Sequence, residues 1–161
     1  MSSWPISELT AEEVLALPAF AEATRAAVGA VVLRQGGEEV LLLRRELGGE
    51  AGSLDELPGG EVGPDETVGD AVRARVLEST SLVVDAVGDL WFGFTYESRL
   101  GATIQFNYAV TVAGVDDAPV VVDPFEHTSY RWARAGDLAA TDLTPTVAQA
   151  LLEHIGPPAP P

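Results

Sequence analysis

The sequence predicts a single α/β domain in which a mixed sheet lies between helices. Runs rich in β-branched and aromatic residues stand before a central helical segment, at 27–34 and 40–44, and again after it, at 83–97 and 103–113. A second helical pattern follows, near 144–155. Strands on both sides of a helix, closed by another helix, favour this arrangement over an all-helical or all-β one.

Residues 1–26 are expected to form a helical extension ahead of the sheet. Thr10 precedes Glu13 at the spacing at which the two residues cap a helix start reciprocally. Pro18 is expected to separate two short helices. The first two β-rich runs are joined by residues 35–38, which have the composition of a hairpin turn.

Residues 54–57 are predicted to form a short strand that leads into a glycine turn. Gly59 and Gly60 allow positive φ and close approach of a ligand, so they are candidate ligand-binding positions. A helix is expected to start near Asp65, with Glu66 in the first turn, where the helix dipole favours acidic side chains. Its apolar residues recur at helical spacing and predict one core-facing stripe, formed by Val68, Ala71, Val72 and Val76.

The segment 57–82 resembles the Nudix box, which reads G, five residues, E, seven residues, then R-E-U-x-E-E-x-G-U, where U is a bulky aliphatic residue. The positions that match are Gly60, Glu66, Val76, Glu78 and Leu82. The positions that depart from it are Ala74, Arg75, Ser79 and Ser81. The box is therefore degenerate. The resemblance covers residues 27–155 and implies a Nudix-like α/β/α sandwich with a central mixed sheet.

The residues on one face of the helix in the box determine whether it can bind a metal. Positions 75, 78 and 79 are neighbours on that face. Three carboxylates there would bind Mg²⁺ or Mn²⁺, which prefer oxygen ligands and bridge to substrate phosphates. Here the face carries Arg75, Glu78 and Ser79, so one carboxylate remains beside a cation. The residues therefore predict that metal binding is weak or absent, although the resemblance implies Mg²⁺-dependent hydrolysis of nucleoside diphosphate linkages.

Several residues are candidates for a site. Glu78 and Glu66 are the candidate catalytic residues. If metal is bound, its expected ligands are Glu78, the Gly59 carbonyl, Glu56 and Glu126. The candidate ligand contacts are Gly59, Gly60, Arg75, Arg44 and Arg99, since arginine binds phosphate well.

Simpler roles compete with these assignments. An ion pair at i,i+3 explains Arg75 and Glu78 equally well. Glu66 is the more ordinary partner of a helix dipole. Glu126 and His127 are expected to be a solvated pair in a loop.

The second half of the chain continues the sheet. Gln105 and Asn107 are expected on one face of a strand, because strand residues alternate between faces. Short strands are predicted at 120–122 and 130–133. Asp142 or Thr144 is expected to cap a last helix that has Pro145 in its first turn. The proline-rich tail 156–161 is predicted to be disordered.

Composition excludes some classes of function. Nine basic residues stand against 25 acidic ones, for a formal net charge of −16. Because non-specific nucleic-acid binding rests on neutralising phosphates, this balance argues against nucleic-acid binding and against an anionic membrane surface. The chain has no cysteine and no long apolar run, so we expect a cytoplasmic protein.

Three hypotheses follow from the sequence. The first is an active Nudix hydrolase whose metal ligands include acids outside the box. The second, which we favour, is a domain that binds a nucleotide or a diphosphate-containing metabolite, with activity impaired or lost and with Arg75 as a fixed cation in place of the metal. The third is a structural or interaction module. A homodimer is left open.

Overall fold

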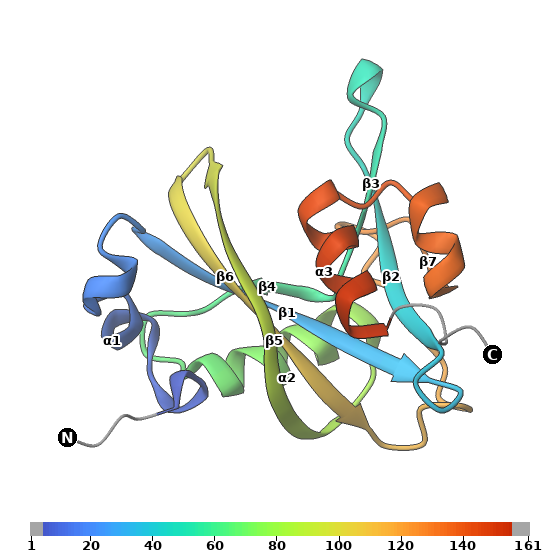
Figure 1. Cartoon of the computed structure of the whole chain (residues 1–161), viewed down its shortest axis with the longest axis horizontal. Helices are drawn as coiled ribbons and strands as arrows, with labels where there is room; N and C mark the ends of the chain where they lie inside the picture. Colours follow the sequence, from blue (N-terminus) through green and yellow to red (C-terminus); the bar gives the residue numbers. More distant parts are fainter. Residues whose placement is uncertain (1–4, 156–161) are drawn as a thin grey trace.

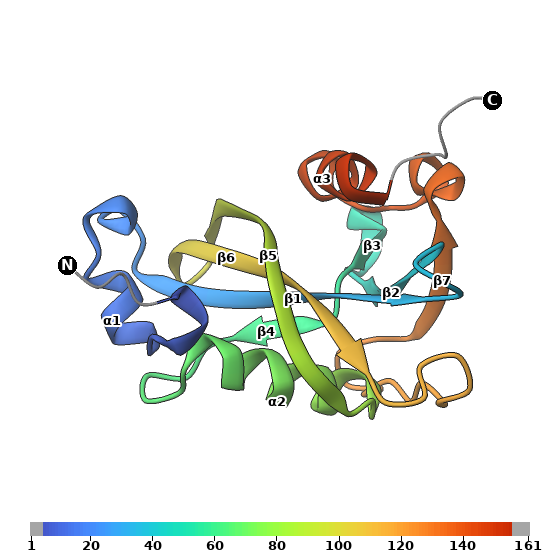
Figure 2. The same cartoon turned by 60° about the horizontal axis from the view of Figure 1, so that its bottom comes forward.

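The computed structural model describes residues 5–155 as a seven-stranded mixed sheet between two helical layers (Figure 2). The strands are β1 (Arg25–Arg34), β2 (Glu39–Glu46), β3 (Ser53–Glu56), β4 (Gly59–Glu61), β5 (Val84–Ser98), β6 (Gly101–Val112) and β7 (Ser129–Arg134). The helices are α1 (Ala11–Leu15), α2 (Val68–Thr80) and α3 (Pro145–Ile155), with short 3₁₀ turns η1 (Ile6–Glu8), η2 (Pro18–Phe20), η3 (Gly49–Ala51) and η4 (Ala135–Ala140). The predicted fold class is confirmed.

Strand β1 joins the two halves of the sheet. The strand order is β3-β2-β1-β6-β5, with β4 also pairing with β1 and β7 with β2. β1 runs parallel to β6, and the other pairs are antiparallel. β1 pairs with β2 only through Leu33 and Arg34, near the hairpin turn, whereas residues 27–29 pair with β4. One half of the sheet, formed by β2, β3 and β7, therefore diverges from the other half, formed by β5 and β6, and β4 lies between them.

Both faces of β1 are buried. Val28 and Val32 pack in the cluster that contains α1 and α2, whereas Val31 packs in the cluster that contains α3. A strand covered on both faces needs apolar residues at successive positions rather than in alternation. This explains the continuous apolar run that β1 shows in the sequence.

Helix α2 packs on the sheet through its predicted stripe, and Val68, Ala71, Val72 and Val76 are all fully or almost fully buried. The helix begins at Val68 rather than near Asp65. Thr67 caps it by accepting a hydrogen bond from the Asp70 amide, because a threonine hydroxyl satisfies one of the free N–H groups of the first turn. Asp65 and Glu66 therefore lie in the preceding loop.

The N-terminal residues pack on the α2 side of the sheet. Thr10 and Glu13 form the predicted capping box at the start of α1. Phe20, in the turn η2 at Pro18, contacts Phe106 edge to face at 5.3 Å between ring centroids. β1 begins at Arg25, so the strand starts two residues before the expected position.

Two sequence expectations are corrected by the structure. Residues 120–122 form no strand, because Val121 donates its amide to the Thr80 carbonyl at the end of α2 and the segment leaves the sheet. Strand β4 was not expected, since Gly59 and Gly60 were assigned to a turn. The predicted disordered tail, residues 156–161, lies outside the described residues.

None of the helices within 5–155 is long and apolar enough to span a membrane.

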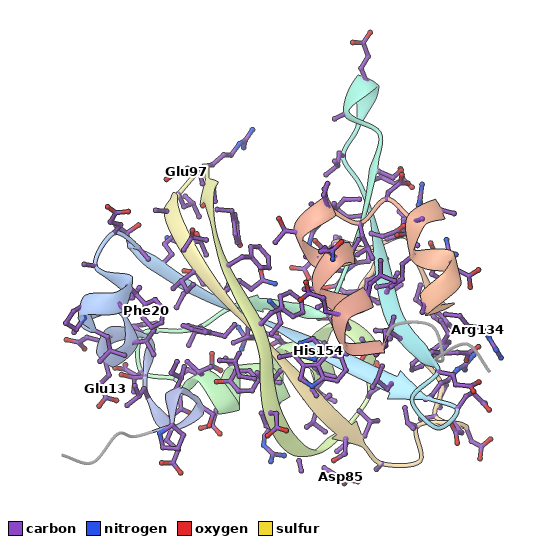
Figure 3. All side chains as sticks on the ribbon, in the orientation of Figure 1. Glu13, Phe20, Asp85, Glu97, Arg134 and His154 are labelled. Carbon is purple, nitrogen blue, oxygen red and sulfur yellow. The ribbon has the colours of Figure 1, made fainter. Side chains whose placement is uncertain are left out.

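The elements leave an opening on the α3 side of the sheet. In Figure 1 the β5–β6 hairpin rises on one side of β1 and β4, and α3 with the β2–β3 hairpin rises on the other. The end of α3 is fixed to β5, because His154 stacks on Trp91 at 4.4 Å between ring centroids (Figure 3). α3 therefore has a defined position beside this opening.

Gly59 lies where two strands approach closely, opposite Gly29 of β1. A Cβ atom on Gly59 would lie 2.0 Å from the Val28 carbonyl oxygen, a backbone atom that cannot rotate away. We expect Gly59→Ala to lower the free energy of unfolding by about 1–3 kcal/mol or more, as overpacking does. Urea unfolding measures this. Gly136→Ala is the control, since a Cβ there meets no atom within 4 Å, and an equal loss in both variants would contradict the packing argument.

Candidate active site

The guanidinium of Arg75 lies among the acidic groups of the box. Its Nη2 donates to Glu66 Oε2 at 3.1 Å, and its Nη1 donates to the Glu61 carbonyl at 3.2 Å. Its Nε lies 3.2 Å from Glu78 Oε2. That last contact is an ion pair without hydrogen-bond geometry, so the buried Nε–H has no hydrogen-bond partner among the described residues. Arg75 thus joins the box loop to α2.

The surrounding residues fit this position of the guanidinium. Gly60 leaves room for the stem of Arg75, since a Cβ on Gly60 would come within 2.9 Å of Arg75 Cδ. The second oxygen of Glu66 accepts the Gly63 amide at 3.0 Å and orders the loop. Ser79 is 2% exposed and donates its hydroxyl to the Arg75 carbonyl within the same helix. Two carboxylates, Glu66 and Glu78, therefore face one cation.

This arrangement does not fit a divalent metal. A hard cation requires several oxygen ligands, preferably charged, and here a positive guanidinium holds the carboxylates of Glu66 and Glu78. No three side chains among histidine, aspartate and glutamate within residues 5–155 come together as a metal site. Of the expected metal ligands, Glu56 accepts from Arg45 and His127, and Glu126 is exposed on the loop before β7.

Glu56 belongs to a separate cluster. Its Oε1 accepts hydrogen bonds from Arg45 at 2.8 Å and from His127 Nε2 at 2.8 Å. His127 is 2% exposed, so the expectation of a solvated Glu126–His127 pair is wrong for the histidine. Burial alone would raise the pKa of Glu56, but the hydrogen bonds from His127 and Arg45 outweigh it, and the pKa lies below its ordinary value.

The other candidate arginines differ in how they are held. Arg44 pairs with Asp142 at 3.1 Å and with the buried carboxylate of Asp55 at 3.4 Å, so acidic groups already surround it. Asp55 also accepts the Asp142 amide at 2.8 Å, which ties β3 to the segment before α3. Arg99 is exposed in the turn between β5 and β6.

A cleft of about 580 Å³ occupies the opening between the two hairpins. One wall is formed by β3, by Leu57 just after it and by the start of α3 with Val147, and the other by Phe94 and Tyr96 of β5. Its floor is formed by β1, β4 and β6. Gly59 and Gly60 line the floor. The volume is within the range of cavities that bind small organic molecules.

Charges in the cleft are paired with one another. Arg25 forms an ion pair with Glu61, and Arg45 forms one with Glu56. Burial in the cleft wall raises the pKa of Tyr96, and the negative charges of Glu56 and Glu61 raise it further. The Tyr96 hydroxyl is therefore a neutral donor in the wall of the cleft.

Arg25 and Glu61 are cleft residues that no local sequence pattern indicated. They lie outside the helix of the box, and only strand pairing brings them together with Tyr96. The register places Arg25, Thr103 and Tyr96 in one row across three strands. The alternation of polar and apolar residues along β6 was a sequence signal for the cleft face. It assigned Gln105 to the face opposite the core residue Phe106.

Comparison with known proteins gives a consistent result. The family model described as NUDIX domain matches residues 23–153. No curated protein matches the chain significantly.

Similar solved structures include three that cover most of the chain. The MutT protein from Methanosarcina mazei Go1 is 25% identical over 80% of this chain and 91% of its own, with a TM-score of 0.67. A MutT NUDIX hydrolase from Burkholderia pseudomallei is 26% identical over 79% and 95%, with a TM-score of 0.64. A C. elegans Ap4A hydrolase, at 18% identity over 81% and 95% and a TM-score of 0.68, shares the fold.

The Glu56 cluster predicts a pH dependence. A carboxyl whose pKa is lower in the folded protein stabilises the fold above its unfolded-state pKa, and this contribution is lost as pH falls through the folded-state value. The wild type should therefore be more stable than Glu56→Gln at pH 7, and the difference should shrink below the ordinary value of 4.5. Urea unfolding of both proteins between pH 7 and acid measures it, and a difference that grows on acidification would contradict it.

Proposed function

The chain belongs to the Nudix family, and from that premise we propose that it binds a nucleotide or related metabolite in the cleft without metal-dependent hydrolysis at the box. The observation that carries the proposal is the position of Arg75 between Glu66 and Glu78. A metal at this face would have to displace a guanidinium that is 24% exposed and held by two carboxylates and a carbonyl. Proposed roles for Glu78 and Glu66 are therefore structural rather than catalytic.

Binding is proposed to take place in the cleft rather than at Arg75. The charge of Arg75 is exceeded by those of Glu66 and Glu78, so this cluster does not attract an anion. The cleft instead offers apolar and aromatic walls for a ring, with Arg25 and Arg45 for an anionic group. A single phosphate group has to compete with Glu61 or Glu56 for these arginines. The related structure named an Ap4A hydrolase is in line with a nucleotide-like ligand.

Metal binding is the first test. We expect Mg²⁺ or Mn²⁺ alone to leave the melting temperature of the wild type unchanged, because a ligand stabilises a protein only if it binds the folded state. Arg75→Glu with Ser79→Glu should create three carboxylates with Glu78. Without metal this variant should lose about 1–3 kcal/mol of stability through like-charge repulsion and a buried carboxylate, and it should regain stability with Mg²⁺.

The control for this experiment is Leu77→Glu, which adds a carboxylate to an exposed position on the same helix. It should not respond to Mg²⁺. Calorimetric titration of all three proteins decides the outcome. Strong Mg²⁺ binding by the wild type would overturn the proposal. Equal, negligible affinity in the wild type and the double variant would show that this face is no metal site even with three carboxylates.

Turnover is the second test. We expect the wild type to hydrolyse nucleoside triphosphates, ADP-ribose and nucleoside diphosphate sugars at a rate that chelator does not change and that stays near the uncatalysed background. Phosphate release or chromatographic separation of products measures it. Several turnovers per second that disappear on chelation would favour the active hydrolase, with metal ligands outside the box.

A further inference from the structure

One side chain on the floor of the cleft has a fixed hydrogen-bonding direction. Gln105 lies near the middle of β6, opposite Phe94 on β5 and Ala27 on β1. Its side chain lines the cleft and is partly exposed. Residues opposite one another in neighbouring strands point to the same face of a sheet, so Gln105 stands between an aromatic ring and a small residue.

Asn107 orients the amide of Gln105. The Asn107 side chain is fully buried, and its Nδ2 lies 3.3 Å from the Phe92 carbonyl. A carbonyl can only accept, so this end of Asn107 must be its NH₂ group. The Asn107 Oδ1 atom is then an acceptor, and Gln105 Nε2 donates to it at 2.8 Å.

Gly29 makes this arrangement possible. A Cβ atom at residue 29 would lie 2.1 Å from Asn107 Oδ1 and 3.0 Å from Gln105 Nε2. The glycine therefore leaves the space in which the two amides meet. Asn107 acts as a positioning residue for Gln105, since it is buried and does not line the cleft.

The direction of these two hydrogen bonds determines which polar atoms of Gln105 remain free to bind a ligand. A glutamine amide has one carbonyl oxygen and two N–H donors. One donor is used by Asn107, and no residue within 5–155 donates to the Gln105 Oε1 atom. The Oε1 acceptor therefore remains free for a ligand. A free carbonyl acceptor is complementary to an exocyclic amino group on a ring, which donates its N–H.

We propose that Gln105 is a specificity-determining residue and that the cleft selects a heteroaromatic ring carrying an exocyclic amino group. The amino group donates to Gln105 Oε1, and Phe94 lies beside the ring. The proposal rests on the proposed function, because it names the class of ring that the same cleft takes. It concerns the ring alone and leaves Arg25 and Arg45 to an attached anionic group.

The experiment uses two ligands that differ by one amino group, adenosine 5′-monophosphate and purine riboside 5′-monophosphate. Calorimetry measures the Kd of each for the wild type, Gln105→Leu and Thr146→Val. Thr146 is the control because it lines the opposite wall and valine has the same shape without the hydroxyl. The wild type should bind the amino ligand about 3- to 10-fold more tightly, the ordinary net value of a neutral hydrogen bond.

Gln105→Leu should bind the two ligands with affinities within about twofold of each other, whereas Thr146→Val should keep the preference. If the wild type binds both ligands equally, or if the preference survives in Gln105→Leu, the role of Gln105 is wrong while cleft binding stands. If the wild type binds neither monophosphate, both the role of Gln105 and the proposed function are overturned.

Discussion

The guanidinium of Arg75, held between the box loop and α2, is the interaction on which the site depends. Glu66 binds it from the loop, Glu78 pairs with it from the same helix, and the Glu61 carbonyl accepts from it at the end of β4. Removing one partner from a half-buried set of charges leaves the others unpaired, which costs more than the set contributes. The Arg75 guanidinium therefore holds β4 against α2. Because Gly59 and Gly60 of β4 line the cleft, this contact determines the position of the cleft floor.

The ion pairs of Arg75 also separate the carboxylates of the box from the cleft, two regions that a metal site at the box would join. On the α2 side, two carboxylates hold one internal cation, so the cluster stays negative and does not attract phosphate. On the α3 side, the cleft has aromatic and apolar walls with Gln105 on its floor. Binding and hydrolysis make different demands on a site, since hydrolysis needs charge stabilisation where charge develops, whereas binding needs only shape and matched polar groups. The proposed function requires only the second set of features.

Much of the fold could be predicted because it depends on local patterns. The stripe of Val68, Ala71, Val72 and Val76 follows helical periodicity, and the capping box at Thr10 is a contact between residues three apart. The start of α2 was misplaced because Asp65 and Thr67 both favour helix starts, and only the Thr67 hydroxyl caps the helix. The pair of Glu56 and the buried His127 joins residues 71 positions apart, so no local pattern could show it. The Arg75–Glu66 contact likewise crosses from loop to helix.

Arg75 and Glu66 form an internal ion pair, and we propose that it takes the place of a metal. A double-mutant cycle of Arg75→Met and Glu66→Gln, measured by urea unfolding in chelator and again in Mg²⁺, tests this proposal. We expect a coupling free energy of about 1–3 kcal/mol, with the same value in both conditions and a wild-type stability that Mg²⁺ does not change. Additive effects of the two substitutions, or a wild type that Mg²⁺ stabilises, would contradict it.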